Sequence, residues 1–268
     1  MITTCINYLR YNRGLSENTC KSYDEALRDF ASYINDVKPG TSWRTVTKQM
    51  IDSYVLSMVE EGHKPATIKQ HISALRTFFK TIQANGGMQT NPARFVSTPK
   101  LTDSLPKTIE IEAIAKVLKS NGTSDQAKAA IAIIFETGIR LQELLDLRKE
   151  DINPTTQSIR IHGKGDKERT VYYGDLTKIY GRKWNPKNET QRHVRHIIYQ
   201  ALKPVSKAPQ LSPHALRHTY ATEMLNNGAK IEVISKLLGH KYIETTQVYA
   251  RMGNKQTEEE YLKFMPKC

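Results

Sequence analysis

The fold of this chain is best predicted from residues 211–251, which read LSPHALRHTYATEMLNNGAKIEVISKLLGHKYIETTQVYAR. Pro213 is placed to open a helix, and the Asn-Asn-Gly run at 226–228 is a stop signal that would end it. A second apolar helix is predicted to end at Gly239, and a third short one follows with a threonine pair as its cap. The side chains of the first helix that are predicted to pack inward are Ala215, Leu216, Tyr220, Ala221 and Leu225. Three short helices are therefore expected in succession.

The same stretch contains side chains suited to phosphate chemistry. His214 and Arg217 are three residues apart, so a helix would place them on one face, from which we expect them to project past its start. His240 follows the glycine that ends the second helix, and Tyr249 comes nine residues later. Neighbouring elements thus supply a cation, imidazoles and a phenol, a combination that suits a phosphate best.

Composition bounds the partners and the compartment. The 268 residues include 40 Lys and Arg against 27 Asp and Glu, a formal net charge of +13, which favours an anionic partner such as nucleic acid. Three scattered cysteines without a CxxC motif argue against a disulfide framework and a zinc site. Neither a secretory signal nor an apolar run long enough for a bilayer is visible. We therefore predict a cytoplasmic protein with no membrane partner.

The first ninety residues are predicted to be helical only. Ser16 and Thr47 offer cap oxygens ahead of amphipathic segments, and Pro65 suits the first turn of another helix. Four helices with short connections predict a small bundle. Its candidate contacts to nucleic-acid phosphates are Lys64, Lys69, Arg76 and Lys80. Each alone is more typical of a solvated helix face, but together, on a basic chain, they could follow a phosphate backbone.

The best domain boundary lies between residues 93 and 106. Prolines spaced by polar residues interrupt the helical pattern at Pro92, Pro99 and Pro106. The sequence therefore predicts a first domain of residues 1–92, a linker of residues 93–106 and a second domain of residues 107–268 with a C-terminal tail helix.

The second domain is predicted to combine helices with a β-hairpin, so the expected fold class is mainly α with a small β part (α+β). Residues 125–138 are apolar nearly all round and are predicted to form a helix at the centre of the core. Residues 157–174 alternate in hydrophobicity around a Gly-Lys-Gly-Asp turn, which predicts a hairpin with Lys164 at its tip. Residues 175–188 are predicted to be rich in loops.

Arg140 and Glu143 follow the central helix, three residues apart. They form either an ordinary surface ion pair or a rigid mount for the guanidinium. Lys164 is followed by Gly165 rather than Ser or Thr, which argues against a nucleotide-binding loop. The zinc-protease motif HExxH is missing around His214, and no carboxylate cluster predicts a two-metal site. We therefore expect chemistry on organic side chains, with no metal and no cofactor.

These residues resemble the tyrosine recombinase (phage integrase) family, with the closest likeness to the Xer recombinases of bacteria and archaea. The segments LSENTCKSYDEALRDF and ISALRTFFK extend the likeness into the first domain, which is similar to the family's SAM-like core-binding domain. Any one motif is weak, but five in order are specific and cover nearly the whole chain. They are Thr137-Gly138-Ile139-Arg140-Leu141-Gln142-Glu143-Leu144, Gly163-Lys164-Gly165-Asp166-Lys167-Glu168-Arg169, His214-Ala215-Leu216-Arg217-His218, Leu237-Leu238-Gly239-His240 and Tyr249.

The resemblance implies the residues that make and break bonds. Tyr249 would attack a DNA phosphate, leaving a 3′-phosphotyrosyl link and a free 5′-hydroxyl. Lys164 would protonate the leaving 5′-oxygen. His214 would take or return the proton of the tyrosine.

It also implies the residues that hold the phosphate. Arg140 and Arg217 would bind the non-bridging oxygens with bidentate, permanently charged forks. His240 would add a hydrogen bond to the phosphate. Glu143 would steady the first arginine and the histidine.

The activity implied is site-specific recombination through a Holliday junction. The expected partners are double-stranded DNA with short inverted-repeat core sites and further copies of the chain in a tetramer. The location would be the cytoplasm, at the nucleoid of a prokaryote, or the gene would belong to a virus or mobile element. A type IB topoisomerase, which shares the side-chain chemistry, and a catalytically silent DNA-binding protein are the alternatives. Retention of every catalytic side chain argues against the second.

Overall fold

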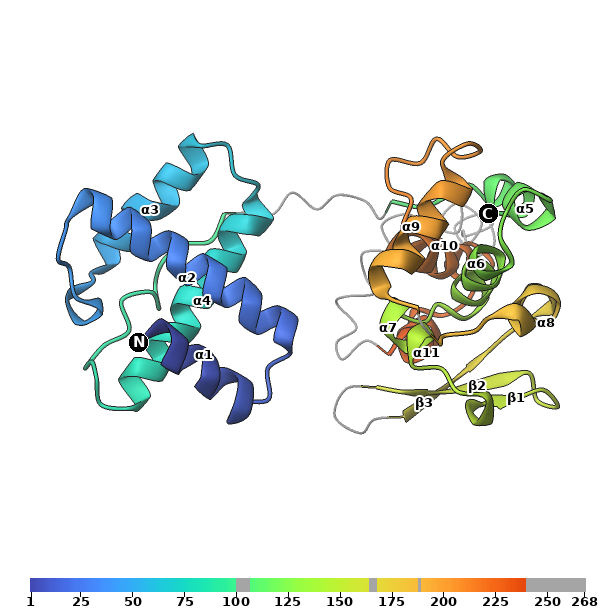
Figure 1. The fold of residues 1–268 in the computed structure, drawn as a ribbon, viewed down its shortest axis with the longest axis horizontal. Coiled ribbons are helices and arrows are strands. Elements are labelled where there is room, and N and C mark those ends of the chain that lie inside the picture. Colours follow the sequence, from blue (N-terminus) through green and yellow to red (C-terminus); the bar gives the residue numbers. More distant parts are fainter. Residues whose placement is uncertain (100–106, 164–167, 188, 240–268) are drawn as a thin grey trace, which may run out of the picture. The chain divides into compact units, whose positions relative to one another are not determined.

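The structure is a computed structural model that describes residues 1–99, 107–163, 168–187 and 189–239. The chain divides into two compact units, Met1–Asp103 and Ser104–Cys268 (Figure 1). None of the helices in the described ranges combines the length and the apolar character needed to cross a bilayer.

The described residues of the first unit form helices joined by loops and no strand, as predicted. Its helices are α1 (Ile2–Tyr11), α2 (Glu17–Val37), α3 (Lys48–Glu60) and α4 (Pro65–Ala84), with a 3-10 turn at Trp43–Thr45. The predicted caps are confirmed. The Ser16 hydroxyl accepts from the amide of Thr19 at 3.2 Å, and the Thr47 hydroxyl accepts from the amide of Met50 at 3.4 Å.

The core of this unit is aromatic. Phe30, Phe78 and Phe79 are fully buried, and the ring of Trp43 lies 4.6 Å from that of Phe78 in an edge-on arrangement. Burying one such ring contributes on the order of 1.5–3 kcal/mol. The core also includes Ala93 and Val96, so it extends past the predicted boundary at residue 92 into the predicted linker.

Arg76, expected on the polar face of the bundle, lies partly inward instead, as does His71. His71 is buried and its Nδ1 is 2.8 Å from the Tyr54 hydroxyl. Arg76 is half-buried, and its guanidinium donates to the carbonyls of Ala93 at 3.2 Å and Val96 at 2.5 Å. A guanidinium presents its donors as a fixed fork, which suits it to holding a segment of backbone. Lys64, Lys69 and Lys80 are exposed, as expected.

The second unit is built around α6 (Asp125–Thr137), whose burial confirms the predicted central helix. It packs against α5 (Ile111–Lys119), α7 (Leu141–Leu145), α8 (Asp175–Tyr180), α9 (Gln191–Leu202) and α10 (Pro213–Asn226) (Figure 1). The last described helix, α11 (Ile231–Leu238), packs against α10.

The predicted hairpin is part of a three-stranded antiparallel sheet in the order β1-β2-β3. Its strands are β1 (Ile152–Asn153), β2 (Ser158–His162) and β3 (Glu168–Tyr172). His162 pairs with Glu168, so the segment that contains Lys164 joins β2 to β3 directly beyond this pair. The small sheet agrees with the predicted α+β class.

Some short elements of the second unit were not predicted. Strand β1 has two residues, and α8 with the 3-10 turn Gly181–Lys183 lies where loops were expected. A distant carboxylate stabilises α8, because Glu136 accepts from the amides of Gly174, Leu176 and Thr177 at 2.8–3.1 Å. These amides are among the donors that a helix start leaves without a helical partner.

Candidate active site

A glycine turn brings the first arginine into the site. Gly138 ends α6 in the left-handed conformation (φ 63°), and a Cβ at this position would lie 2.4 Å from a ring carbon of Tyr220. Both the backbone angle and the lack of space therefore require glycine. Two residues later, Arg140 is the N-cap of α7.

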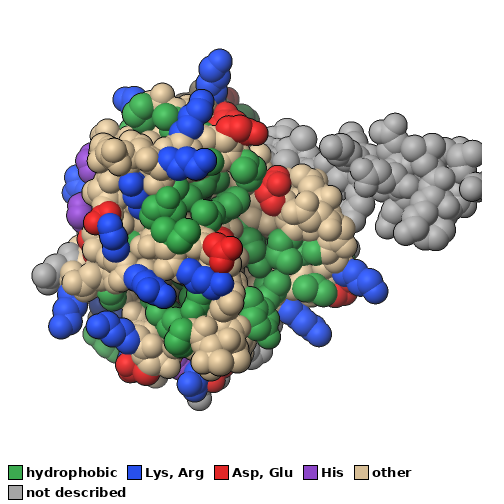
Figure 2. Space-filling view, turned by 90° about the vertical axis from the view of Figure 1, so that its right-hand side faces the viewer, with side chains coloured by type: hydrophobic (Ala, Val, Ile, Leu, Met, Phe, Trp, Pro, Cys, Tyr) green, Lys and Arg blue, Asp and Glu red, His purple; other side chains and the backbone are tan. Residues whose placement is uncertain are grey.

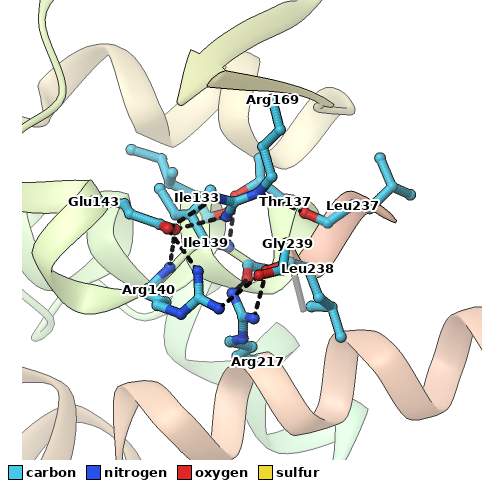
Figure 3. Close-up of polar contacts among 11 residues, drawn as sticks. Ile133, Thr137, Ile139, Arg140, Glu143, Arg169, Arg217, Leu237, Leu238 and Gly239 are labelled. Atoms are coloured by element: carbon cyan, nitrogen blue, oxygen red, sulfur yellow. Dashed lines mark hydrogen bonds and ion pairs between the residues drawn. The ribbon is translucent and has the colours of Figure 1, made fainter. Parts of the chain in front are cut away.

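Arg217 extends from α10 into the interior, with only 3% of its surface exposed. Its Nη1 donates to the carbonyl of Gly138 at 2.5 Å and its Nη2 to the carbonyl of Leu238 at 2.7 Å (Figure 3). These carbonyls lie at the C-terminal ends of α6 and α11, where helix dipoles favour a cation. The expectation that Arg217 projects past the start of its helix is therefore wrong, because backbone acceptors inside the unit hold it.

Arg140 is fixed beside it but remains open to solvent. Its Nη1 donates to Glu143 Oε1 at 2.8 Å and its Nη2 to the carbonyl of Gly239 at 3.1 Å, while 45% of its side chain is exposed. The two guanidiniums thus bind the consecutive carbonyls of Leu238 and Gly239 (Figure 3). Two fixed, permanently charged forks at one turn form a site for an anion with several oxygens, such as a phosphate diester.

Glu143 is the carboxylate that holds this arrangement. Its side chain is 8% exposed and accepts from the amide and the guanidinium of Arg140 and, through both oxygens, from Arg169. Burial by itself would raise the pKa of Glu143, but the hydrogen bonds and positive charges of Arg169 and Arg140 lower it to about 2. Arg140 and Glu143 therefore form a rigid mount for the guanidinium and not an ordinary surface ion pair.

The second unit is expected to lose stability in acid through Glu143. The carboxyl has a lower pKa folded than its ordinary value of 4.5, so its contribution is complete above about pH 4.5 and is lost as the pH falls through about 2. The loss amounts to roughly 3 kcal/mol. Urea unfolding across this range measures it, and Glu143→Gln should remove this part of the pH dependence. An unchanged dependence in that variant would contradict the assignment.

Arg169 was not predicted as a site residue. Its Nη1 and Nη2 donate to the two oxygens of Glu143 at 2.8 and 2.7 Å, and its Nε donates to the carbonyl of Leu237 at 2.8 Å (Figure 3). The sequence does carry a signal for it. Arg169 lies two residues before Val171 and so on the inward face of its strand, where a cation needs a partner.

His214 lies at the start of α10, exposed to solvent, with its ring packed edge-on against His218 at 4.3 Å between centroids. Partial burial of the ring lowers the pKa of His214, and the positive charges of Arg217 and Arg140 lower it further. The imidazole is therefore neutral at physiological pH and able to accept a proton. Arg140, Glu143 and Arg217 thus lie together, and the two arginines are near enough to His214 to lower its pKa.

Lys164, His240 and Tyr249 lie outside the described residues. Among the residues that are described, no group of three or more His, Cys, Asp or Glu side chains could hold a metal ion. The described side chains are suited to binding an anion at Arg140 and Arg217 and to accepting a proton at His214.

The chain matches two family descriptions, "Phage integrase family" over residues 107–256 and "Phage integrase, N-terminal SAM-like domain" over residues 2–86. It is 30% identical to tyrosine recombinase XerD of Listeria monocytogenes, over 100% of this chain and 99% of that protein. It is 29% identical to tyrosine recombinase XerC of Thermodesulfovibrio yellowstonii, over 99% of this chain and 96% of that protein.

Solved structures share the fold. The XerH site-specific recombinase bound to a palindromic difH substrate aligns with a TM-score of 0.76 at 20% identity, covering 97% of this chain and 84% of that one. A lambda integrase (75–356) dimer bound to a COC′ core site aligns with a TM-score of 0.72 at 17% identity, covering 91% and 92%. Both parts of the chain are matched, and relatives cover it almost end to end. The chain belongs to the phage integrase family of tyrosine recombinases.

Proposed function

We propose that this chain is a site-specific DNA recombinase that cuts and rejoins DNA strands through a phosphotyrosine intermediate. The observation that carries the proposal is the pair of guanidiniums on the consecutive carbonyls of Leu238 and Gly239, one buried and one open to solvent. Such a pair can bind a phosphate diester without a metal ion, since the two fixed positive charges stabilise the phosphate in place of a metal cation.

Arg140 and Arg217 hold the non-bridging oxygens of the scissile phosphate. Negative charge grows on these oxygens as the diester passes through an in-line displacement, and donors fixed in advance stabilise that charge most effectively. Glu143 keeps Arg140 in place through two hydrogen bonds, at 2.7 and 2.8 Å. It acts through the arginine and does not touch the phosphate.

In the proposed reaction each bond that breaks is replaced by one that forms, so no external energy source is needed. The Tyr249 hydroxyl oxygen attacks the phosphorus while the bond to the 5′-oxygen breaks, leaving a 3′-phosphotyrosyl link. His214, neutral at physiological pH, accepts the phenolic proton, and Lys164 supplies a proton to the leaving 5′-oxygen. His240 adds a hydrogen bond to the phosphate. Attack by the 5′-hydroxyl of another strand reverses these steps and returns the tyrosine.

DNA is the partner, and the proposed sites are short inverted-repeat cores on which four copies assemble and exchange strands through a Holliday junction. The first unit is the proposed core-binding domain, residues 1–92 extended to Val96, joined by a linker to the catalytic domain that begins at residue 107. Cytoplasmic location, at the nucleoid, follows from the DNA partner.

The Lys and Arg side chains of the second unit do not cover its surface evenly. On the face drawn in Figure 2, Lys and Arg side chains are mixed with Asp and Glu around hydrophobic ones. A mixed surface gives phosphates no continuous row of cations to follow. The proposed DNA contact of this unit is the cluster around Arg140 and Arg217.

Lys69→Ala and Arg76→Ala are expected to separate DNA contact from folding in the first unit. Lys69 is exposed on α4, so its loss should weaken DNA binding evenly across sequences and reduce the slope of log affinity against log salt by about 1. Arg76 holds the carbonyls of Ala93 and Val96, so its loss should lower the free energy of unfolding by about 1–3 kcal/mol. Salt titrations and urea unfolding of both variants measure this. Equal salt slopes for Lys69→Ala and the wild type would contradict the proposed contact.

The proposed function is tested with a library of DNA duplexes, each nicked near a randomised central segment. Cleavage beside the nick releases a short fragment, so religation fails and a covalent adduct that survives boiling in detergent accumulates. Intact duplexes carrying two copies of a captured site should then exchange strands. Relaxation of supercoils without exchange would favour a topoisomerase, and binding without any adduct would favour a silent DNA-binding protein.

A further inference from the structure

Arg169 joins three elements of the second unit that the proposed reaction requires. It lies on β3, directly after Glu168, whose pairing with His162 is the last described pair before the segment that contains Lys164. Its guanidinium reaches Glu143 on α7 and the carbonyl of Leu237 on α11. Arg169 therefore connects the hairpin of β2 and β3 with the two segments that hold Arg140. These are α7, which carries Glu143, and the end of α11, where the Gly239 carbonyl accepts from Arg140.

The geometry at Glu143 is specific. Each carboxylate oxygen accepts one hydrogen bond from Arg169 and one from Arg140, all at 2.7–2.8 Å. Without the fork of Arg169, the carboxylate would keep only the two bonds to Arg140 and would be free to turn. A lysine has the same charge but a single nitrogen, so it cannot bind both oxygens and the Leu237 carbonyl at once.

The packing against α11 is equally close. A Cβ at Gly239 would lie 3.0 Å from Cδ of Arg169 and 3.1 Å from its Nε. The side chain thus lies directly over the glycine whose carbonyl binds Arg140 and after which His240 follows. Only 13% of the Arg169 side chain is exposed, so it acts from within the unit and not at the DNA surface.

On these contacts, and resting on the proposed function, we propose that Arg169 is a positioning residue for strand cleavage: it fixes Glu143, and through it Arg140, while anchoring the turn at Gly239. Its proposed effect on the phosphate runs only through Glu143 and Arg140. Its fork makes the orientation of Arg140 depend on strand β3, which carries Arg169.

Arg169→Lys tests this, with Arg160→Lys as the charge-matched control on the exposed face of the neighbouring strand. Single-turnover adduct formation on a site captured from the nicked library is measured at saturating protein. Arg169→Lys should slow cleavage by about 10²-fold, the cost of a small misplacement of a catalytic group, while the Kd for DNA stays within about threefold. Arg160→Lys should leave both unchanged.

The pH profile and a double variant distinguish positioning from general stability. Loss of the fork should raise the pKa of Glu143, so below about pH 4.5 the rate of Arg169→Lys should fall more steeply with decreasing pH than the wild-type rate does. The double variant Arg169→Lys/Glu143→Gln should cleave almost as fast as Glu143→Gln alone, because each change disrupts the same hydrogen bonds around residue 143. A wild-type rate and pH profile for Arg169→Lys, or fully additive losses, would overturn the proposal.

The acid dependence of unfolding tests the role of Arg169 independently of the proposed function. If the wild type forms no adduct, the recombinase assignment fails, and urea unfolding then decides the role of Arg169 by itself. Arg169→Lys should lose less stability than the wild type between about pH 4.5 and about pH 2, since its Glu143 is less strongly shifted. The same acid dependence in both proteins would overturn the coupling.

Discussion

Tyr249→Phe is expected to form no covalent adduct with nicked DNA. The change removes the phenolic oxygen alone, and this oxygen is the atom that the mechanism joins to phosphorus. DNA affinity should remain within about twofold of the wild type, because the proposed phosphate contacts of Arg140 and Arg217 and the proposed backbone contacts of the first unit are untouched. Adduct formation is followed on denaturing gels, and affinity by titration at fixed salt.

Tyr242 provides the matched control for this experiment. It lies seven residues before Tyr249 in the same stretch, so Tyr242→Phe removes an identical group nearby. This variant should form the adduct at the wild-type rate. The opposite result, an adduct with Tyr249→Phe and none with Tyr242→Phe, would move the nucleophile to the other tyrosine.

Arg217→Lys and Arg140→Lys should both slow cleavage by about 10²–10³-fold, the cost of removing one fixed donor from a charge-stabilising site. They should differ in stability. Arg217 is 3% exposed and holds the carbonyls of Gly138 and Leu238, which a lysine cannot reach together. Leaving one buried carbonyl unpaired costs about 1–3 kcal/mol. The side chain of Arg140 is 45% exposed, so Arg140→Lys should change the free energy of unfolding little.

Single-turnover cleavage and urea unfolding of the two variants, measured side by side, check this contrast. Each change keeps the charge, so electrostatic attraction of DNA is matched between them. A stable Arg217→Lys protein that cleaves like the wild type would remove Arg217 from the clamp. Equal destabilisation by both changes would contradict the division between a buried and an accessible guanidinium.

Local chemistry made much of the fold predictable. The cap residues Ser16 and Thr47 and the helix-opening Pro65 act within a few residues of themselves, so the helix starts could be predicted from the sequence. The central helix α6 was predictable because its apolar residues run all round it. The short helix α8 was not, since the carboxylate of Glu136 that caps it lies about forty residues away in the chain.

The site shows the same division. The spacing of three residues between Arg140 and Glu143 was enough to predict that these two side chains meet. The burial of Arg217 could not be predicted, because its acceptors are the carbonyls of Gly138 and Leu238, brought near only by the packing of α6 and α11. Arg169 was missed for a similar reason, since Glu143 lies 26 residues before it. Backbone acceptors and long-range pairs leave little trace in a local pattern.

In the proposed mechanism, two fixed guanidiniums present one DNA phosphate to Tyr249. Identifying the residue joined to DNA in the trapped adduct, by nuclease and trypsin digestion followed by tandem mass spectrometry, tests this. We expect a nucleotide attached through its 3′-phosphate to Tyr249, in the tryptic peptide of residues 242–251. A phosphate found on any other side chain, or linked through a 5′-phosphate, would contradict it.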